Sequence, residues 1–207
     1  MANLMDLLQG QLDDNLIGQL SNQLGGVDRQ KTTVAAQGVM TTLVTALAKN
    51  AAHPEKAAGL EKALDNDHDG SILDNLTDLL GGNAQPQNAR AMNGAGIIKH
   101  LLGGQQSGAV DMISQMSGLN SGQTGNLMAT LAPIVMGMLG KQKRQQGLDI
   151  GGIANMLSGT VNQQRSSGNP LMDMANRFLD QDGDGSALDD VAGMVGKGLL
   201  GKLFGGR

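Results

Sequence analysis

The chain has no cysteine, tryptophan or tyrosine, and only two of its 207 residues are phenylalanine. The absence of cysteine excludes disulfides, thiolate catalysis and cysteine-ligated zinc or iron–sulfur sites. The scarcity of aromatic residues leaves Leu, Ile, Val, Ala and the 13 Met to fill the interior, which favours helices over sheets. We therefore expect an all-α protein, long enough to bury a substantial core.

A long apolar run and a broad basic surface are also absent. The longest nearly uncharged apolar run, residues 131–140, is about half the length needed to cross a bilayer, so we expect a soluble protein without a membrane partner. The N-terminus lacks the basic region of a Sec signal, which predicts a cytoplasmic protein or one exported without that signal. The net charge is −4 and the basic residues are scattered apart from KQKR at 141–144, which argues against nucleic acid as a partner.

Motifs of catalytic sites are missing too. The sequence contains no nucleophile elbow, P-loop or His-Glu-x-x-His motif, and His53, His68 and His100 are too dispersed for a zinc triad. We expect His68 to face solvent, and His100 to lie on a helix surface near the glycines that end the helix. The sequence therefore predicts that the protein is not an enzyme.

What the chain does contain is a repeat, because its two halves carry the same motifs in the same order. Met-Thr-Thr-Leu at Met40 corresponds to Met-Ala-Thr-Leu at Met128, and an acidic loop at Asp65 corresponds to one at Asp180. The loops start 115 residues apart and the Met motifs 88, so the second copy holds an insertion of about 27 residues. The predicted organisation is a first helical repeat over 1–82, a linker over 83–96, and a second repeat with the insertion over 97–207.

Several helix starts can be predicted from local chemistry. Asp28 is the expected N-cap of a long helix, and Asn120 or Ser121 opens its counterpart in the second copy. Pro54 and Pro170 should each lie in the first turn of a helix that leads directly into an acidic loop. The residues expected on the buried face of the first long helix are Ala36, Val39, Leu43 and Leu47.

The two acidic loops share the pattern Asp-x-Asp-x-Asp-Gly-Ser-x-Leu-Asp. Alternating carboxylates in a turning loop bring oxygens to one point, and Ca²⁺ requires about six to eight oxygens at roughly 2.3–2.6 Å. The glycine at position 6 permits a sharp turn, as in an EF-hand loop, but Leu76 and Val191 replace the bidentate Glu of position 12. The predicted ligands are Asp65, Asp67, Asp69, Ser71 and Asp74 in the first loop and Asp180, Asp182, Asp184, Ser186 and Asp189 in the second.

The last acid of each loop has a second interpretation. Ser71-x-x-Asp74 and Ser186-x-x-Asp189 also match a capping box, so both acids are either ligands or helix caps. The three acids before each glycine have no such explanation, because their mutual repulsion needs a cation or solvent to offset it. We therefore predict Ca²⁺, or Mg²⁺ in its place, as the bound ion.

A family resemblance lies in TTLVTALAKNAAHPEKAAGLEKAL, GAGIIKHLLGG, LAPIVMGMLG and FLDQDGDGSALDD, which are similar to the bacterial family known as domain of unknown function 937. The resemblance covers most of the chain and implies a bacterial, all-helical, duplicated protein, but no activity. From the loops we expect a non-enzymatic calcium-binding protein whose cations brace helix–loop–helix junctions, for scaffolding or calcium-responsive assembly. The alternative is a self-assembling structural subunit, a homo-oligomer in which the loops are incidental. Its contacts would be the C-terminal helix and faces rich in Met112, Met116, Met128, Met136 and Met138.

Overall fold

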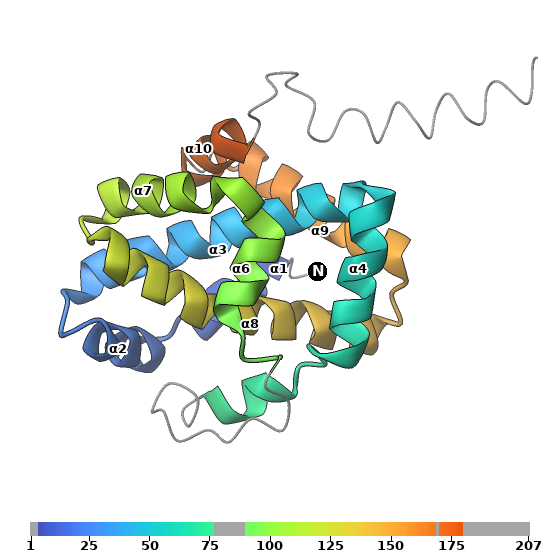
Figure 1. Cartoon of the computed structure of the whole chain (residues 1–207), viewed down its shortest axis with the longest axis horizontal. Coiled ribbons are helices and arrows are strands. Elements are labelled where there is room, and N and C mark those ends of the chain that lie inside the picture. The colour runs from blue at the N-terminus through green and yellow to red at the C-terminus, as the bar shows by residue number, and fades with distance from the viewer. Residues whose placement is uncertain (1–3, 77–89, 169, 180–207) are drawn as a thin grey trace, which may run out of the picture.

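A computed structural model of the chain describes residues 4–76, 90–168 and 170–179 (Figure 1). These residues form α-helices and two short 3-10 helices and contain no strand, which confirms the all-α prediction. The helices are α1 (Leu4–Gln11), α2 (Asp14–Gln23), α3 (Arg29–Ala52), α4 (Pro54–Asn66), α6 (Gly94–Leu102), α7 (Gln106–Ser117), α8 (Ser121–Gln146), α9 (Ile150–Ser166) and α10 (Pro170–Leu179), with 3-10 helices η1 (Ser71–Asn75) and η2 (Gly103–Gln105).

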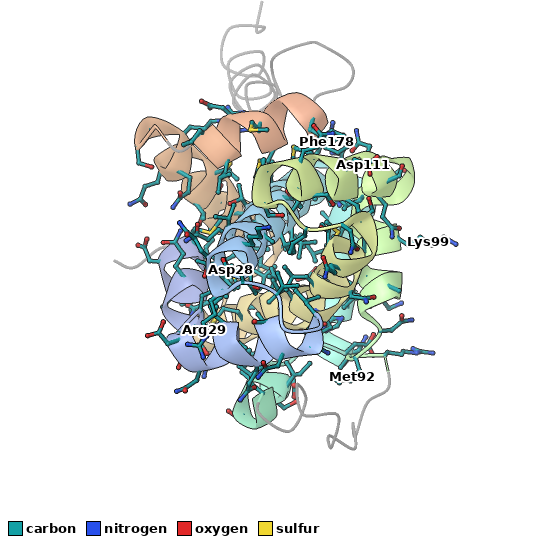
Figure 2. The ribbon with its side chains drawn as sticks, turned by 90° about the vertical axis from the view of Figure 1, so that its left-hand side faces the viewer. Asp28, Arg29, Met92, Lys99, Asp111 and Phe178 are labelled. Atoms are coloured by element: carbon teal, nitrogen blue, oxygen red, sulfur yellow. The ribbon has the colours of Figure 1, made fainter. Side chains whose placement is uncertain are left out.

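The predicted helix starts are confirmed where the structure describes them. The side chain of Asp28, which is labelled in Figure 2, accepts a hydrogen bond from a backbone N–H in the first turn of α3. Asn120 caps α8 in a capping box with Gln123, and Pro54 and Pro170 are the first residues of α4 and α10. Each start follows from hydrogen bonding or backbone restriction within one turn, so it does not depend on distant contacts.

α3 is the centre of the bundle, and every other described α-helix contacts it (Figure 1). The predicted face of α3 is buried, but so are positions on its other sides. Most of its residues are Ala, Thr, Val and Gly, whose small side chains allow helices to approach from several directions. The hydroxyls of Thr42 and Thr45 donate to the carbonyls of Gly38 and Thr41 at 2.8 and 2.7 Å, so these polar groups are satisfied inside the core.

α8 makes two contacts so close that only glycine fits. A Cβ on Gly94, at the start of α6, would lie 1.8 Å from the carbonyl oxygen of Ala129. A Cβ on Gly140 would lie 1.7 Å from the carbonyl oxygen of His68, in the first acidic loop. Pro133 has no N–H to donate to the Ala129 carbonyl one turn earlier, and the first turn of α6 covers that carbonyl. Both segments therefore pack against α8 through their backbones.

α10 lies across α7 and α9 at one end of the bundle (Figure 1). Phe178 of α10 packs onto α7 (Figure 2), where a Cβ on Gly108 would lie 2.6 Å from the ring atom Cε2. At the end of α10, the Leu179 carbonyl accepts a hydrogen bond of 2.7 Å from Nζ of Lys49 on α3. The second acidic loop begins at the next residue, Asp180, and lies outside the described residues.

The described parts of the two predicted repeats share one cluster of buried apolar side chains. The cluster includes Leu8 and Leu43 from the first part and Leu131 and Leu157 from the second. The predicted insertion, residues 145–170, contains α9, which packs against α3. The predicted linker is described only from residue 90 onward, and α6 begins within it at Gly94. Across residues 4–76, 90–168 and 170–179, no helix combines the length and the apolar character that a bilayer crossing demands.

We expect Gly94→Ala to lower the free energy of unfolding by roughly 1–3 kcal/mol, because the new methyl group would force α6 away from the Ala129 carbonyl. Gly125→Ala on α8 is the matched control, since nothing lies within 4 Å of a Cβ at that position. The control should stabilise the protein by about 0.5–1 kcal/mol through helix propensity. Urea denaturation measures both effects, and changes of the same sign would contradict the close packing of α6 on α8.

Candidate functional site

The first acidic loop connects α4 to η1 and lies against the C-terminal half of α8. Asp65 is in the last turn of α4, and Asp67 is the residue that follows the helix. Gly70 has a φ of 92° and ψ of −7°, a left-handed conformation that glycine adopts without strain. The structure therefore has the sharp turn that the sequence predicts at this glycine.

Asp69 is held by hydrogen bonds within the loop. Its Oδ1 accepts from the Ser71 N–H at 2.9 Å and from the Ser71 hydroxyl at 2.6 Å. The hydroxyl bond has the largest effect, ahead of the N–H bond, and together they lower the pKa of Asp69. Because the Ser71 hydroxyl is used in this way and η1 has no side-chain cap, the alternative capping box with Asp74 is not formed.

The basic end of α8 supplies counter-charge to the loop. Lys143 Nζ contacts the Asp65 carboxylate and lies 4.0 Å from a carboxylate oxygen of Glu61. The guanidinium of Arg144 contacts the backbone carbonyl of Asp69 and lies 3.5 Å from its Oδ2. In the sequence these residues stand out only as the short basic run at 141–144, and their pairing with the loop was not predicted.

The predicted metal ligands are only partly brought together. Asp65 is directed to Lys143, Asp69 to Ser71 and Arg144, and Asp74 is exposed on η1. Within the described residues, no three acidic, His or Cys side chains are arranged so that they could hold a metal ion. The predicted ligands of the second loop, which all lie outside the described residues, are Asp180, Asp182, Asp184, Ser186 and Asp189.

The prediction that His68 faces solvent is wrong, because only 5% of the residue is exposed. The reason is the contact of the loop backbone with α8: Gly140 admits the His68 carbonyl, and Gly137 admits Ile72, whose Cγ2 would lie 2.5 Å from a Cβ there. Two glycines three residues apart on one helix are the sequence signal that could have indicated this contact. His100, in contrast, is exposed near Gly103 at the end of α6, as predicted.

Burial gives His68 an unusual environment. Its Nδ1 is buried without a hydrogen-bond partner, and the side chain lines a cavity of about 190 Å³. Burial lowers the pKa of His68, although the charges of Asp67 and Asp69 oppose the shift. The imidazole is therefore kept neutral near pH 7, between the acidic loop and the cavity.

Together these residues define an all-helical bundle in which an acidic helix–loop–helix junction is docked on the basic end of a long helix. The chain belongs to the family described as Bacterial protein of unknown function (DUF937), whose sequence model matches residues 6–142 and 145–207. The family resemblance predicted from the sequence is thereby confirmed. No curated protein and no solved structure matches the chain.

In metal-free buffer, we expect the free energy of unfolding to fall as the pH is lowered from about 7 to 5. The unfolded chain binds a proton on His68 near the ordinary pKa of 6.5, whereas the folded chain, in which the pKa of His68 is lowered, binds it only at a lower pH. The charged and titratable groups around His68 are Asp67 and Asp69 on the loop and Lys56, Arg90 and His100 across the cavity.

His68→Gln should reduce this pH dependence, which is measured by urea denaturation at several pH values. His53→Gln is the control, because His53 is exposed at the start of α4. An unchanged slope in His68→Gln would show that the buried imidazole does not cause the loss of stability in acid.

Proposed function

We propose that the protein is a non-enzymatic calcium-binding helical protein in which a divalent cation braces the junction that follows α4. The observation that carries the proposal is the first acidic loop. Its three alternating carboxylates, Asp65, Asp67 and Asp69, precede a left-handed glycine between the end of one helix and the start of the next. Ca²⁺, and Mg²⁺ as its competitor, bind such sets of carboxylate and carbonyl oxygens.

A cation at the first loop must displace the ion pairs that Lys143 and Arg144 make with Asp65 and Asp69. The Arg144–Asp69 pair is exposed on both sides, at 58% and 43%, and such a pair contributes about 1 kcal/mol or less. In the other pair Asp65 is 50% exposed, but the Lys143 side chain is only 11% exposed. A cation at 100 times its dissociation constant stabilises the folded state by about 2.7 kcal/mol. The dissociation constant that a titration measures already contains the cost of displacing both ion pairs. The two basic side chains act as the counter-ions of the metal-free loop.

The order of the helices supports a duplicated repeat. The series α1, α2, α3, α4 and acidic loop corresponds to α6, α7, α8 and α10 followed by the second acidic motif, with α9 inserted. Contacts between the two halves are reciprocal. Lys143, in the last turn of α8, contacts Asp65 of the first loop, and Lys49, in the last turn of α3, contacts the carbonyl that precedes the second loop. Each long helix thus places a lysine at the end of the helix that precedes the acidic motif of the other half.

The self-assembly alternative gains less support from the described residues. Met128, Met136 and Met138 are buried in the core, and Met112 and Met116 are partly buried. In the described ranges, Met174 is the large apolar side chain that is exposed, at 40%. The methionines therefore provide no broad apolar face for a second copy here, and the C-terminal helix that the alternative also requires lies outside these ranges.

The proposal predicts that Ca²⁺ stabilises the full chain. At 100 times the dissociation constant, each site should raise the melting temperature by roughly 5–10 °C, because unfolding exposes the acids and loses the ion. Calorimetric titration of chelator-treated protein should give two ions per chain, and replacement of Asp65, Asp67 and Asp69 by Asn should reduce this to one.

A matched control replaces three exposed acids elsewhere, Asp14, Asp111 and Asp173, by Asn. This variant changes the net charge equally and should still bind two ions. Melting temperatures that are identical with Ca²⁺ and with chelator, together with no heat of binding, would exclude the proposed function.

A second prediction concerns the counter-ions. Lys143→Gln with Arg144→Gln should tighten Ca²⁺ binding at the first loop by roughly two- to fivefold for each pair removed, because the cation no longer displaces them. Lys62→Gln with Lys99→Gln is the control, since both lysines are exposed and Lys99 points away from the bundle (Figure 2). Titrations at about 0.15 M salt screen long-range effects; weaker binding in the first variant would contradict the exchange of counter-ions.

A further inference from the structure

The cavity beside His68 has the size of a site for one small molecule. It measures about 190 Å³ and is bounded by α3, α4, α6 and α8. An engineered cavity of about 150 Å³ binds benzene, whereas pockets for drug-sized ligands begin near 300 Å³. A ligand here would therefore consist of about one ring, or a short branched chain, with one polar substituent.

The walls of the cavity determine the chemistry of that ligand. Apolar side chains line much of it, among them Leu60 on α4, Ile97 on α6 and Met136 on α8. The charged side chains that line it in the described part of the chain are Lys56 and Arg90, and no Asp or Glu is among them. These walls suit an apolar body that carries a negative charge.

Two further features favour a negative group at the same place. The N-terminal end of α6, at Asn93 and Gly96, borders the cavity, and the positive end of a helix dipole attracts anions. His68 also lines the cavity, is 5% exposed and has an Nδ1 without a hydrogen-bond partner. Unpartnered polar atoms are rare inside proteins, and an oxygen of a ligand would give the imidazole a partner.

We propose that this cavity binds a small monocarboxylate with an apolar body, held by Lys56 at its charged end and by α4, α6 and α8 around its apolar end. The His68 imidazole lies beside the bound molecule as a hydrogen-bonding group. The site is distinct from the carboxylates of the acidic loop, and it does not depend on cation binding there.

Three probes separate the contributions of charge and apolar body: benzoate, its neutral analogue benzamide, and acetate, which has the charge without the ring. Each is titrated into the full ¹⁵N-labelled chain, in chelator and again in Ca²⁺. Benzoate should give saturable shifts confined to amides of the first loop and of the helices that bound the cavity, α3, α4, α6 and α8, with a dissociation constant at least tenfold below those of the other two. Equal binding of benzamide or of acetate would overturn the proposal, and so would the absence of saturable shifts with benzoate.

Variants on α4 place the binding in the cavity. Ala63→Leu should fill it and abolish benzoate binding, whereas Ala58→Leu, on the exposed side of the same helix, should not. Lys56→Gln should weaken binding at least threefold, and Lys62→Gln, the same change at an exposed position outside the lining, should leave it unchanged. Wild-type affinity in Lys56→Gln would overturn the proposal even if Ala63→Leu failed to fold.

Discussion

Backbone contact between the first acidic loop and α8 fixes most of what surrounds the loop. Because Gly140 has no side chain, the carbonyl of His68 can lie directly against the helix. That contact places Asp65 and Asp69 beside Lys143 and Arg144, and it turns the imidazole of His68 into the interior. The counter-ions of the loop and the burial of the histidine both depend on this one approach.

The loop and the cavity differ in charge although they share His68. On one side are the carboxylates of Asp67 and Asp69, which favour a protonated ring, and on the other are Lys56 and Arg90. Desolvation outweighs the two carboxylates, so the ring between them stays neutral. A neutral imidazole can both donate and accept a hydrogen bond, which suits a position between an acidic loop and a basic cavity wall.

The sequence alone predicted the features that depend on a single turn of the chain. Asp28, Asn120 and the two prolines mark helix starts through their own hydrogen bonds or ring geometry. It was insufficient for contacts between distant segments: Lys143 and Asp65 are 78 residues apart, and nothing in the composition pairs them. The prediction that His68 is exposed was wrong for the same reason. The fourth residue of an acidic loop, counted here from Asp65, faces solvent only when no helix covers it. For α3 the prediction was partly complete. Its periodicity indicated one buried face, which is buried, but the small residues on its other faces also allow helices to pack there.

Gly94 and Gly140 have a consequence for how such a chain can change in sequence. In most cores, a larger residue can be accommodated when a neighbouring side chain becomes smaller. At these two positions the opposing atom is a main-chain oxygen, of Ala129 or of His68, which every amino acid carries. No second substitution can create the missing space. Both positions therefore require glycine, whichever residues occupy the rest of the loop and of α6.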